Sequence, residues 1–176
     1  MRIRPAEPGD ATALAAIYAF HVAHGTATFD TVAPPPEVFA ERVLALRAAG
    51  APFLVAERDG AILGYAYAAR FRDRPAYRFT CENSIYVADG ERGKGVGRAL
   101  LAALLAAARE AGFRQMIAVI GGGEPASVAL HAACGFIEAG RMRSVGRKFG
   151  RWLDTVYMQR ALGAGESEPV LCSEGS

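Results

Sequence analysis

A glycine-rich stretch between positions 86 and 101, YVADGERGKGVGRALL, constrains the fold of this chain more than any other segment. The run before it, FTCENSIYVA, is typical of a strand, and the alanine- and leucine-rich run after it predicts a helix from Gly95 to Ala111, closed by Gly112. The alternating glycines at the junction let a ligand approach the main chain closely. Because the free N–H groups at a helix start attract anions, the stretch predicts an anion-binding strand–turn–helix.

Positive side chains flank these glycines at Arg92, Lys94 and Arg98, and a diphosphate is the ligand that this combination suits best. A Walker loop requires Ser or Thr where this chain has Gly95, and a Rossmann fingerprint requires an acid in the region GFRQMI. The third interpretation is a coenzyme A site, for which the pattern Arg92-x-x-Gly95-x-Gly97 is diagnostic. A mobile loop that simply leads into a helix is the remaining alternative.

Composition excludes several other classes of protein. The 176 residues suffice for one domain with a sizeable core, and 52% hydrophobic with 22% charged residues is typical of a globular protein. A net charge of +2 gives no indication of nucleic-acid binding. The three cysteines are widely spaced, no metal-ligand spacing is present, and no apolar run suits a signal peptide or a membrane span. We therefore expect a cytoplasmic protein with reduced thiols, no metal, no nucleic-acid partner and no membrane contact.

Hydrophobic periodicity and turn residues predict the regular elements. Helices are expected over about 9–25 (with Asp10 as the N-cap), 37–49, 95–111 and 125–135. Strands are expected over 2–5, on both sides of the Asp59-Gly60 turn within 52–72, over 79–88 and 115–120, and twice between 136 and 162.

The expected order of elements is β-α-α-β-β-β-α-β-α-β-β. Three strands that can pair with their neighbours in antiparallel fashion are followed by a β-α-β unit, which favours a mixed sheet. We predict an α/β (α+β) fold of three layers, with a central sheet of about seven strands and helices on both faces. The residues 1–162 form a single domain in this interpretation, and 163–176 form a disordered tail.

Several blocks of this chain resemble the GNAT superfamily of N-acetyltransferases. They are the [QR]-x-x-G-x-[GA] signature at 92–97 and the segment ALHAACGF at 129–136. A closer resemblance, to the branch that acetylates phosphinothricin and methionine sulfone or sulfoximine, rests on GTATFD (25–30), RPAYRFTCENSIYV (74–87), MIAVIG (116–121) and RSVGRKFGRWLDTVYMQR (143–160). The resemblance covers residues 1–162 and implies a GNAT-like fold.

The resemblance also implies the donor and its binding site. Acetyl-CoA is the expected co-substrate, and the main chain near Val87 is expected to part from its neighbouring strand, so that its N–H polarises the thioester carbonyl. The residues expected to bind coenzyme A are Ile85, Tyr86, Val87, Arg92, Gly93, Lys94, Gly95, Val96, Gly97 and Arg98.

Acetylation of an α-amino group requires a general base, because that group is mostly an ammonium ion near pH 7. Glu82 is the candidate, since it lies in an otherwise apolar strand where burial would raise its pKa. A strand-edge glutamate on a solvated face is the alternative. His131 takes the place of a tyrosine that many family members use as general acid, and we favour a packed, hydrogen-bonded core residue there. Glu124 takes the place of an asparagine that commonly contacts the cofactor, which puts that contact in doubt.

The substrate-binding residues follow from the same resemblance and from charge. The loop RFRDRPAYR offers arginines for a carboxylate, with Arg74 as the first choice, and a solvated loop is the alternative. Lys148 and Phe149 are weaker candidates that would reach the site of a neighbouring subunit. The set expected to bind substrate is Thr28, Phe29, Arg72, Arg74, Ala76 and Glu82.

We therefore expect an acetyl-CoA-dependent N-acetyltransferase that acts on the α-amino group of a small amino-acid analogue, from a homodimer. The alternatives are an acetyltransferase for a polyamine or a protein N-terminus, and a sensor that binds acyl-CoA without catalysis. A polyamine or peptide substrate would favour an acidic groove, whereas the loop at 70–78 is basic.

Overall fold

The structure is a computed structural model and describes residues 1–167. Its strands and helices follow the predicted order, with three short 3₁₀ helices added. The strands are β1 (Arg2–Pro5), β2 (Phe53–Arg58), β3 (Ala61–Arg70), β4 (Thr80–Val87), β5 (Gln115–Gly121), β6 (Ile137–Lys148) and β7 (Arg151–Ala161). The α-helices are α1 (Ala11–His24), α2 (Pro36–Ala48), α3 (Val96–Glu110) and α4 (Pro125–Ala133).

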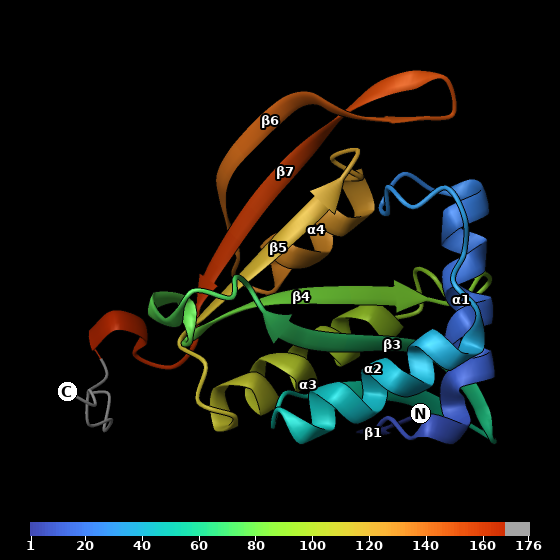
Figure 1. Cartoon of the computed structure of the whole chain (residues 1–176), viewed down its shortest axis with the longest axis horizontal. Helices are drawn as coiled ribbons and strands as arrows, with labels where there is room; N and C mark the ends of the chain where they lie inside the picture. Colours follow the sequence, from blue (N-terminus) through green and yellow to red (C-terminus); the bar gives the residue numbers. More distant parts are fainter. Residues whose placement is uncertain (168–176) are drawn as a thin grey trace.

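The strands form one mixed sheet in the order β1-β2-β3-β4-β5-β7-β6. All neighbouring strands are antiparallel except β4 and β5, which are parallel. The β4–β5 pairing spans only Thr80 to Asn83 on β4, and beyond it the two strands separate, as Figure 1 shows. The mixed seven-stranded sheet predicted from the sequence is confirmed.

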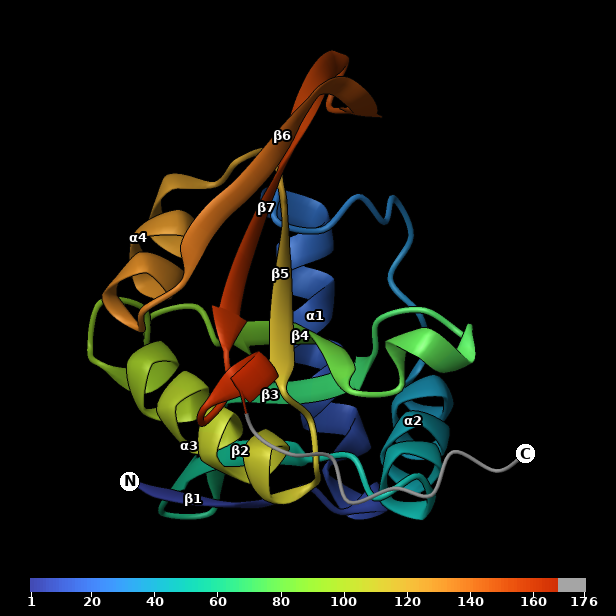
Figure 2. The ribbon, with the colours of Figure 1, turned by 90° about the vertical axis from the view of Figure 1, so that its left-hand side faces the viewer.

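Helices cover both faces of the sheet and enclose two separate hydrophobic cores. On one face, α1 and α2 pack against side chains such as Phe53, Val55 and Tyr65. On the other face, α3 packs against Ala66 and Ala68, which alternate with the first set along the strands. Figure 2 shows α3 and α4 on one side of the sheet and α1 and α2 on the other. The three-layer prediction is therefore confirmed.

The structure has the predicted turn at Asp59-Gly60, and it gives the side chain of Asp10 different partners from those of a helix cap. Asp59 and Gly60 have φ angles of 51° and 79°, which suits the tight β2–β3 hairpin. Asp10 occupies the N-cap position of α1, but its side chain makes no cap hydrogen bond there. It accepts the Glu7 N–H at 2.8 Å and pairs with the guanidinium of Arg4 at 2.8 Å. Asp10 therefore holds the predicted N-cap position of α1, while the ion pair with Arg4 and the preceding 3₁₀ turn occupy its carboxylate.

The segment expected as a disordered tail is described only in its first residues. Within it, Gly165–Ser167 form a short 3₁₀ helix, and 168–176 lie outside the described residues. Across residues 1–167, no helix is both long and apolar enough to cross a membrane.

Candidate active site

The end of β4 has backbone groups that no neighbouring strand uses. Hydrogen bonds from Ala88 N to Leu63 O (2.9 Å) and from Phe71 N to Thr80 O (3.1 Å) show that the even-numbered residues of β4 pair with β3. The odd-numbered residues therefore direct their N–H and C=O groups toward β5. Since the pairing with β5 ends at Asn83, the backbone N–H groups of Ile85 and Val87 face the gap between the strands. Tyr86 instead pairs with Tyr65 of β3.

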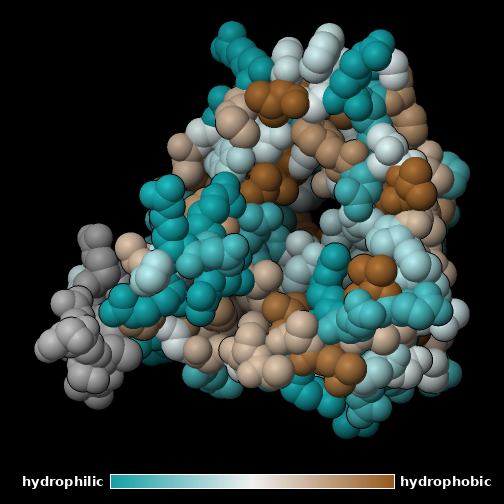
Figure 3. All heavy atoms as spheres, in the orientation of Figure 1, coloured by the Kyte–Doolittle hydropathy of each residue, from teal (hydrophilic) through white to brown (hydrophobic). Residues whose placement is uncertain are grey.

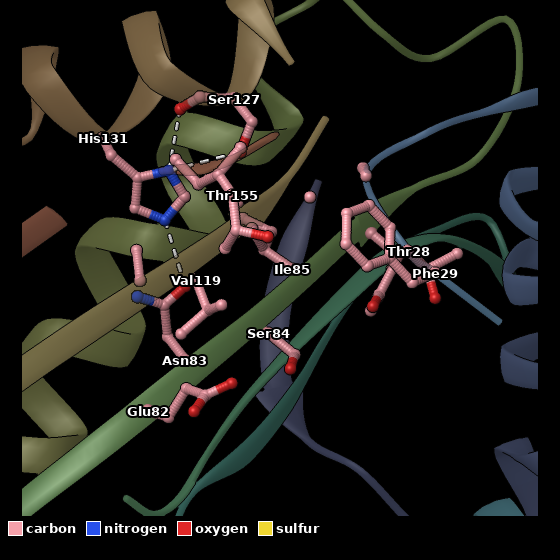
Figure 4. A pocket seen from close by; sticks show the side chains of 15 residues that line it. Thr28, Phe29, Glu82, Asn83, Ser84, Ile85, Val119, Ser127, His131 and Thr155 are labelled. Carbon is pink, nitrogen blue, oxygen red and sulfur yellow. Dashed lines mark hydrogen bonds between the residues drawn. The ribbon is translucent and has the colours of Figure 1, made fainter. Parts of the chain in front are cut away.

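A cavity of about 240 Å³ lies beside this gap. Side chains from the α1–α2 loop, β4 and α4 point toward it, as Figure 4 shows, and the surface in Figure 3 is hollowed in the same region. The lining residues that matter for chemistry are Thr28, Phe29, Glu82, Asn83, Ile85 and His131. The structure thus brings together three residues expected to bind substrate, Thr28, Phe29 and Glu82, with the open edge of β4.

Glu82 is half-buried and lies on the floor of this cavity (Figure 4). Burial raises the pKa of its carboxyl group, and the positive charge of Arg72 partly opposes that shift. A carboxylate whose pKa rises toward neutrality is a better proton acceptor at physiological pH than one with an ordinary pKa. The expected alternative, a glutamate on a solvated face, does not match this location.

His131 is packed and hydrogen-bonded while it also lines the cavity. Its ring is 2% exposed, with Nδ1 at 2.8 Å from the carbonyl oxygen of Ser127 and Nε2 at 3.0 Å from Oδ1 of Asn83. The amide Nδ2 of Asn83 donates in turn to the carbonyl of Ile117 at 3.3 Å. Burial lowers the pKa of His131, opposed by the hydrogen bond to Ser127. The packed, hydrogen-bonded state that we favoured from the sequence agrees with these contacts.

The glycine-rich loop leads into α3 with its backbone donors unsatisfied. Gly93 and Gly95 have φ angles of 75° and 83°, a region in which glycine is unstrained. Gly95 is the N-cap of α3 and has no side chain to cap the first N–H groups of the helix. Gly97 has a different reason to be glycine, because a Cβ there would lie 3.3 Å from Cδ2 of Leu130 on α4. The helix start is therefore suited to an anion.

The cations of this loop are exposed and paired with local acids. Arg92 contacts Asp89 at 2.7 Å, and Lys94 contacts Glu91 at 3.2 Å. Arg98 is exposed in the first turn of α3. Since exposed ion pairs contribute little stability, an arriving diphosphate can replace the carboxylates as the partner of these side chains.

His21 of α1 binds a backbone carbonyl at the end of β4. Its Nε2–H donates to the carbonyl oxygen of Val87 at 2.8 Å, and its ring lies 5.4 Å from that of Tyr86. Burial lowers the pKa of His21, so the neutral ring is favoured. Because the N–H and C=O of one strand residue point to the same side, this contact occupies the carbonyl of Val87 and leaves its N–H toward the gap.

The three remaining residues expected to bind substrate lie on the loop after β3. Arg72, Arg74 and Ala76 are exposed and do not line the cavity. The guanidinium of Arg72 stacks on Phe71, 4.1 Å from the ring centroid, and its charge acts on Glu82. Arg74 precedes the 3₁₀ helix Pro75–Tyr77. Of Arg72 and Arg74, it is Arg72 whose positive charge lowers the pKa of Glu82.

Lys148 lies within its own chain's site region. It is 4% exposed, and its Nζ donates to the carbonyl oxygen of Thr28 at 2.9 Å. The Thr28 hydroxyl contacts Tyr18 Oη at 2.7 Å, and Tyr18 donates to Asp30 at 2.7 Å. Phe149 follows at the hairpin tip and is 55% exposed. Lys148 therefore anchors the α1–α2 loop of its own chain, and its ammonium group lies 5.1 Å from the centroid of the exposed Phe149 ring.

Glu124 caps the start of α4. The Glu124 carboxylate accepts the Ser127 N–H at 2.8 Å and caps α4, so a side-chain cap fills the place of the family's usual asparagine. Within residues 1–167, no group of three His, Cys, Asp or Glu side chains is arranged to hold a metal ion.

Sequence reasoning missed two contributors to the site. Asn83 is not among the residues expected from the sequence, and its Oδ1 contacts Nε2 of His131. His21 contacts the carbonyl oxygen of Val87 across 66 positions of sequence. The alternation of β4 could have indicated that Asn83 faces away from Glu82, but no local signal links His21 to the end of β4.

Comparison with known proteins agrees with this geometry. The family model described as "Acetyltransferase (GNAT) domain" matches residues 3–157. A phosphinothricin N-acetyltransferase from Alcaligenes faecalis is 52% identical over 94% of this chain and 84% of its own length. An L-methionine sulfoximine/L-methionine sulfone acetyltransferase from Pseudomonas paraeruginosa is 46% identical over 68% of this chain and 70% of its own.

A solved structure shares the fold and has the donor bound. The crystal structure of a phosphinothricin acetyltransferase from Sinorhizobium meliloti, in complex with AcCoA, superposes with a TM-score of 0.92. It is 46% identical and covers 96% of this chain and 91% of its own. The family model, the identities and the shared fold agree with the open edge of β4 and the anion site of α3, and the chain belongs to the GNAT family of N-acetyltransferases.

Proposed function

We propose that this chain transfers an acetyl group from acetyl-CoA to the α-amino group of a small amino-acid analogue: phosphinothricin, methionine sulfoximine or methionine sulfone. The names of its relatives support this substrate class. The observation that carries the proposal is the half-buried Glu82, whose raised pKa occurs in a cavity beside the unpaired edge of β4. Base and oxyanion donor thus lie on one strand, with Glu82 just before the point where β4 and β5 separate and Val87 beyond it.

Glu82 is the proposed general base of this reaction. Its carboxylate removes a proton from the substrate ammonium, directly or through a water molecule, and the free amine attacks the thioester carbonyl. The carbonyl oxygen gains negative charge during the attack, and the N–H of Val87 is the proposed donor that stabilises it. The attack forms the carbon–nitrogen bond, and the collapse breaks the carbon–sulfur bond and releases the thiolate. The nitrogen loses its second proton to water or to the departing thiolate, and His131 is the other group that could protonate this thiolate.

The residues present fit acetyl-CoA as the donor. The uncapped start of α3 and the positive φ angles of Gly93 and Gly95 leave backbone N–H groups open to a diphosphate. Bound acetyl-CoA supplies the thioester that is attacked. The residues proposed to hold it are Ile85, Val87, Arg92, Gly93, Lys94, Gly95, Val96, Gly97 and Arg98, together with the backbone next to Tyr86.

Substrate binding is proposed to use both the cavity and the basic loop beside it. Thr28 and Phe29 line the cavity opposite Glu82. Arg72, with Arg74 and Ala76 on the same exposed loop, is the proposed partner of the substrate carboxylate. A basic loop at this point favours an amino acid over a polyamine.

We also propose a homodimer in the cytoplasm. The β6–β7 hairpin supports the dimer, because it exposes apolar side chains that water solvates poorly: Ile137, Met142, Val145, Phe149 and Trp152. The free thiols of Cys81 and Cys134 support the reducing compartment.

A thiol-release assay with acetyl-CoA tests the function. We expect activity with amino-acid sulfones, sulfoximines or phosphinates, and none or little with polyamines and peptides. Activity confined to polyamines or peptides would contradict the substrate class. Acetyl-CoA binding without turnover on any amine would instead favour the sensor.

A further inference from the structure

Phe29 lies against two glycines of the sheet, Gly121 and Gly146. Its ring faces the end of β5 and the second half of β6, which flank β7 in the sheet. Gly121 of β5 pairs with Thr155 of β7, and Gly146 of β6 pairs with Leu153. Residues 153 and 155 share one face of β7, and directly paired residues share a face, so both glycines lie on the same face.

Gly146 makes room for the ring. A Cβ on Gly146 would lie within 2.7 Å of three ring carbons of Phe29, closer than real Cβ atoms approach other atoms. A Cβ on Gly121 would lie 3.0 Å from Cε1 of the same ring and 2.8 Å from the carbonyl oxygen of Thr26. The φ angle of Gly146 is not in the left-handed region, so the backbone conformation does not require glycine. Glycine is required at position 146 because the Phe29 ring occupies the space that a side chain would fill.

The neighbouring contact fixes the loop that carries the ring. Lys148 lies two positions after Gly146, on the same face of β6, and donates to the carbonyl oxygen of Thr28. The chain is therefore held immediately before Phe29, and the ring cannot easily move away with the whole loop. The other side of the ring faces the cavity that contains Glu82 (Figure 4).

We propose that Gly146 is a specificity-determining position, because its missing side chain decides how far the Phe29 ring withdraws from the cavity and thus how long a substrate side chain fits. A side chain at position 146 pushes the ring into the cavity and shortens the space opposite Glu82. This inference rests on the proposed function, since it concerns the acyl acceptor of the same site. Gly146 itself does not line the cavity, so the effect is indirect.

The test compares methionine sulfone with its S-propyl homologue in the wild type and in Gly146→Ala. We expect the ratio of kcat/KM for the longer over the shorter substrate to fall by about tenfold or more. The KM for acetyl-CoA should stay the same. Gly140→Ala is the matched control on β6, because within the described chain a Cβ there would meet no atom within 4 Å. An unchanged ratio in Gly146→Ala would overturn the inference.

Two further variants keep the test decisive. Phe29→Leu removes part of the ring, so it should raise the ratio for the longer homologue, also in the Gly146→Ala background. If Gly146→Ala does not fold, Phe29→Leu alone decides the test. An unaltered ratio of kcat/KM for the longer over the shorter substrate in Phe29→Leu then overturns the inference. If the wild type acetylates no amino-acid sulfone, sulfoximine or phosphinate, the proposed substrate class is wrong. A crystal structure of Gly146→Ala then decides separately: a ring displaced into the cavity supports the inference, and an undisplaced ring overturns it.

Discussion

The Nε2–H of His21 donates a hydrogen bond of 2.8 Å to the carbonyl oxygen of Val87, the residue whose N–H faces the gap between β4 and β5. This contact joins α1 to the end of β4 across 66 positions of sequence. It satisfies the one acceptor that Val87 directs toward the gap. The edge near the proposed reaction centre therefore offers a donor to the developing oxyanion.

Loss of this hydrogen bond is expected to lower turnover more than binding. His21→Leu should reduce kcat about tenfold, because an unheld strand end no longer aims the Val87 N–H, while the KM for acetyl-CoA changes little. His21→Gln should retain more of the activity, since its amide can donate to the same carbonyl. Steady-state kinetics with both variants test this. Equal kcat losses in the two variants would indicate a packing role for the ring.

Removal of the proposed base should separate activity from stability. Glu82→Gln is expected to lower kcat/KM by about 10²–10⁴-fold at neutral pH. Burial raises the pKa of Glu82, so its contribution to stability is present at low pH and is lost as pH rises through the folded-state pKa. At pH 8 the variant should therefore melt at the same temperature as the wild type or higher. A lower melting temperature with full activity would contradict both assignments.

The acid limb of the pH profile should depend on Arg72. The wild-type kcat/KM falls as pH drops through the pKa of Glu82, because the base becomes protonated. Arg72 lowers that pKa, so Arg72→Gln should shift the acid limb to higher pH. Arg74→Gln is the control, and we expect it to raise the substrate KM without this shift. If the acid limb shifts in Arg74→Gln and not in Arg72→Gln, Arg74 and not Arg72 acts on the pKa of Glu82.

The start of α3 should control donor affinity. Arg98→Ala is expected to raise the KM for acetyl-CoA about 10–100-fold with little change in kcat, because a charged hydrogen bond to phosphate is lost. The effect should weaken at high salt. Arg109→Ala is the matched control, since Arg109 is an exposed arginine in the last turn of the same helix. Identical KM values for the two variants would argue against a diphosphate at the helix start.

The hydrogen bond from Lys148 to the α1–α2 loop should contribute measurably to the free energy of unfolding. Lys148→Met removes the donor to the Thr28 carbonyl and should lower the free energy of unfolding by about 1–3 kcal/mol, because a buried acceptor loses its partner. It should also raise the substrate KM, since Phe29 follows Thr28. Arg147→Met is the control, because Arg147 is exposed and points to the opposite face of β6. Chemical denaturation of both variants compares them; equal stabilities would contradict the anchor.

Local patterns in the sequence determined the order of the strands and helices and the main turns of this protein. The order of strands and helices, the Asp59-Gly60 turn and the glycine-rich start of α3 follow from periodicity, backbone freedom and helix termini, which act between residues close in sequence. The signature at 92–97 and the segment at 129–136 also sufficed to predict the family, which the comparisons confirm. Asp10 holds its predicted N-cap position, although its carboxylate pairs with Arg4 and does not bond to the first turn of the helix.

The composition of the site was decided by tertiary structure. The β4–β5 gap depends on where two strands stop pairing, and burial of Glu82 depends on which side chains surround it. His21 meets Val87, Lys148 meets Thr28, and Gly146 faces Phe29 only because the sheet and its covering loop bring distant segments into contact. Such contacts have no signature in sequence spacing, because packing and strand register, rather than local conformational preference, select the residues that touch.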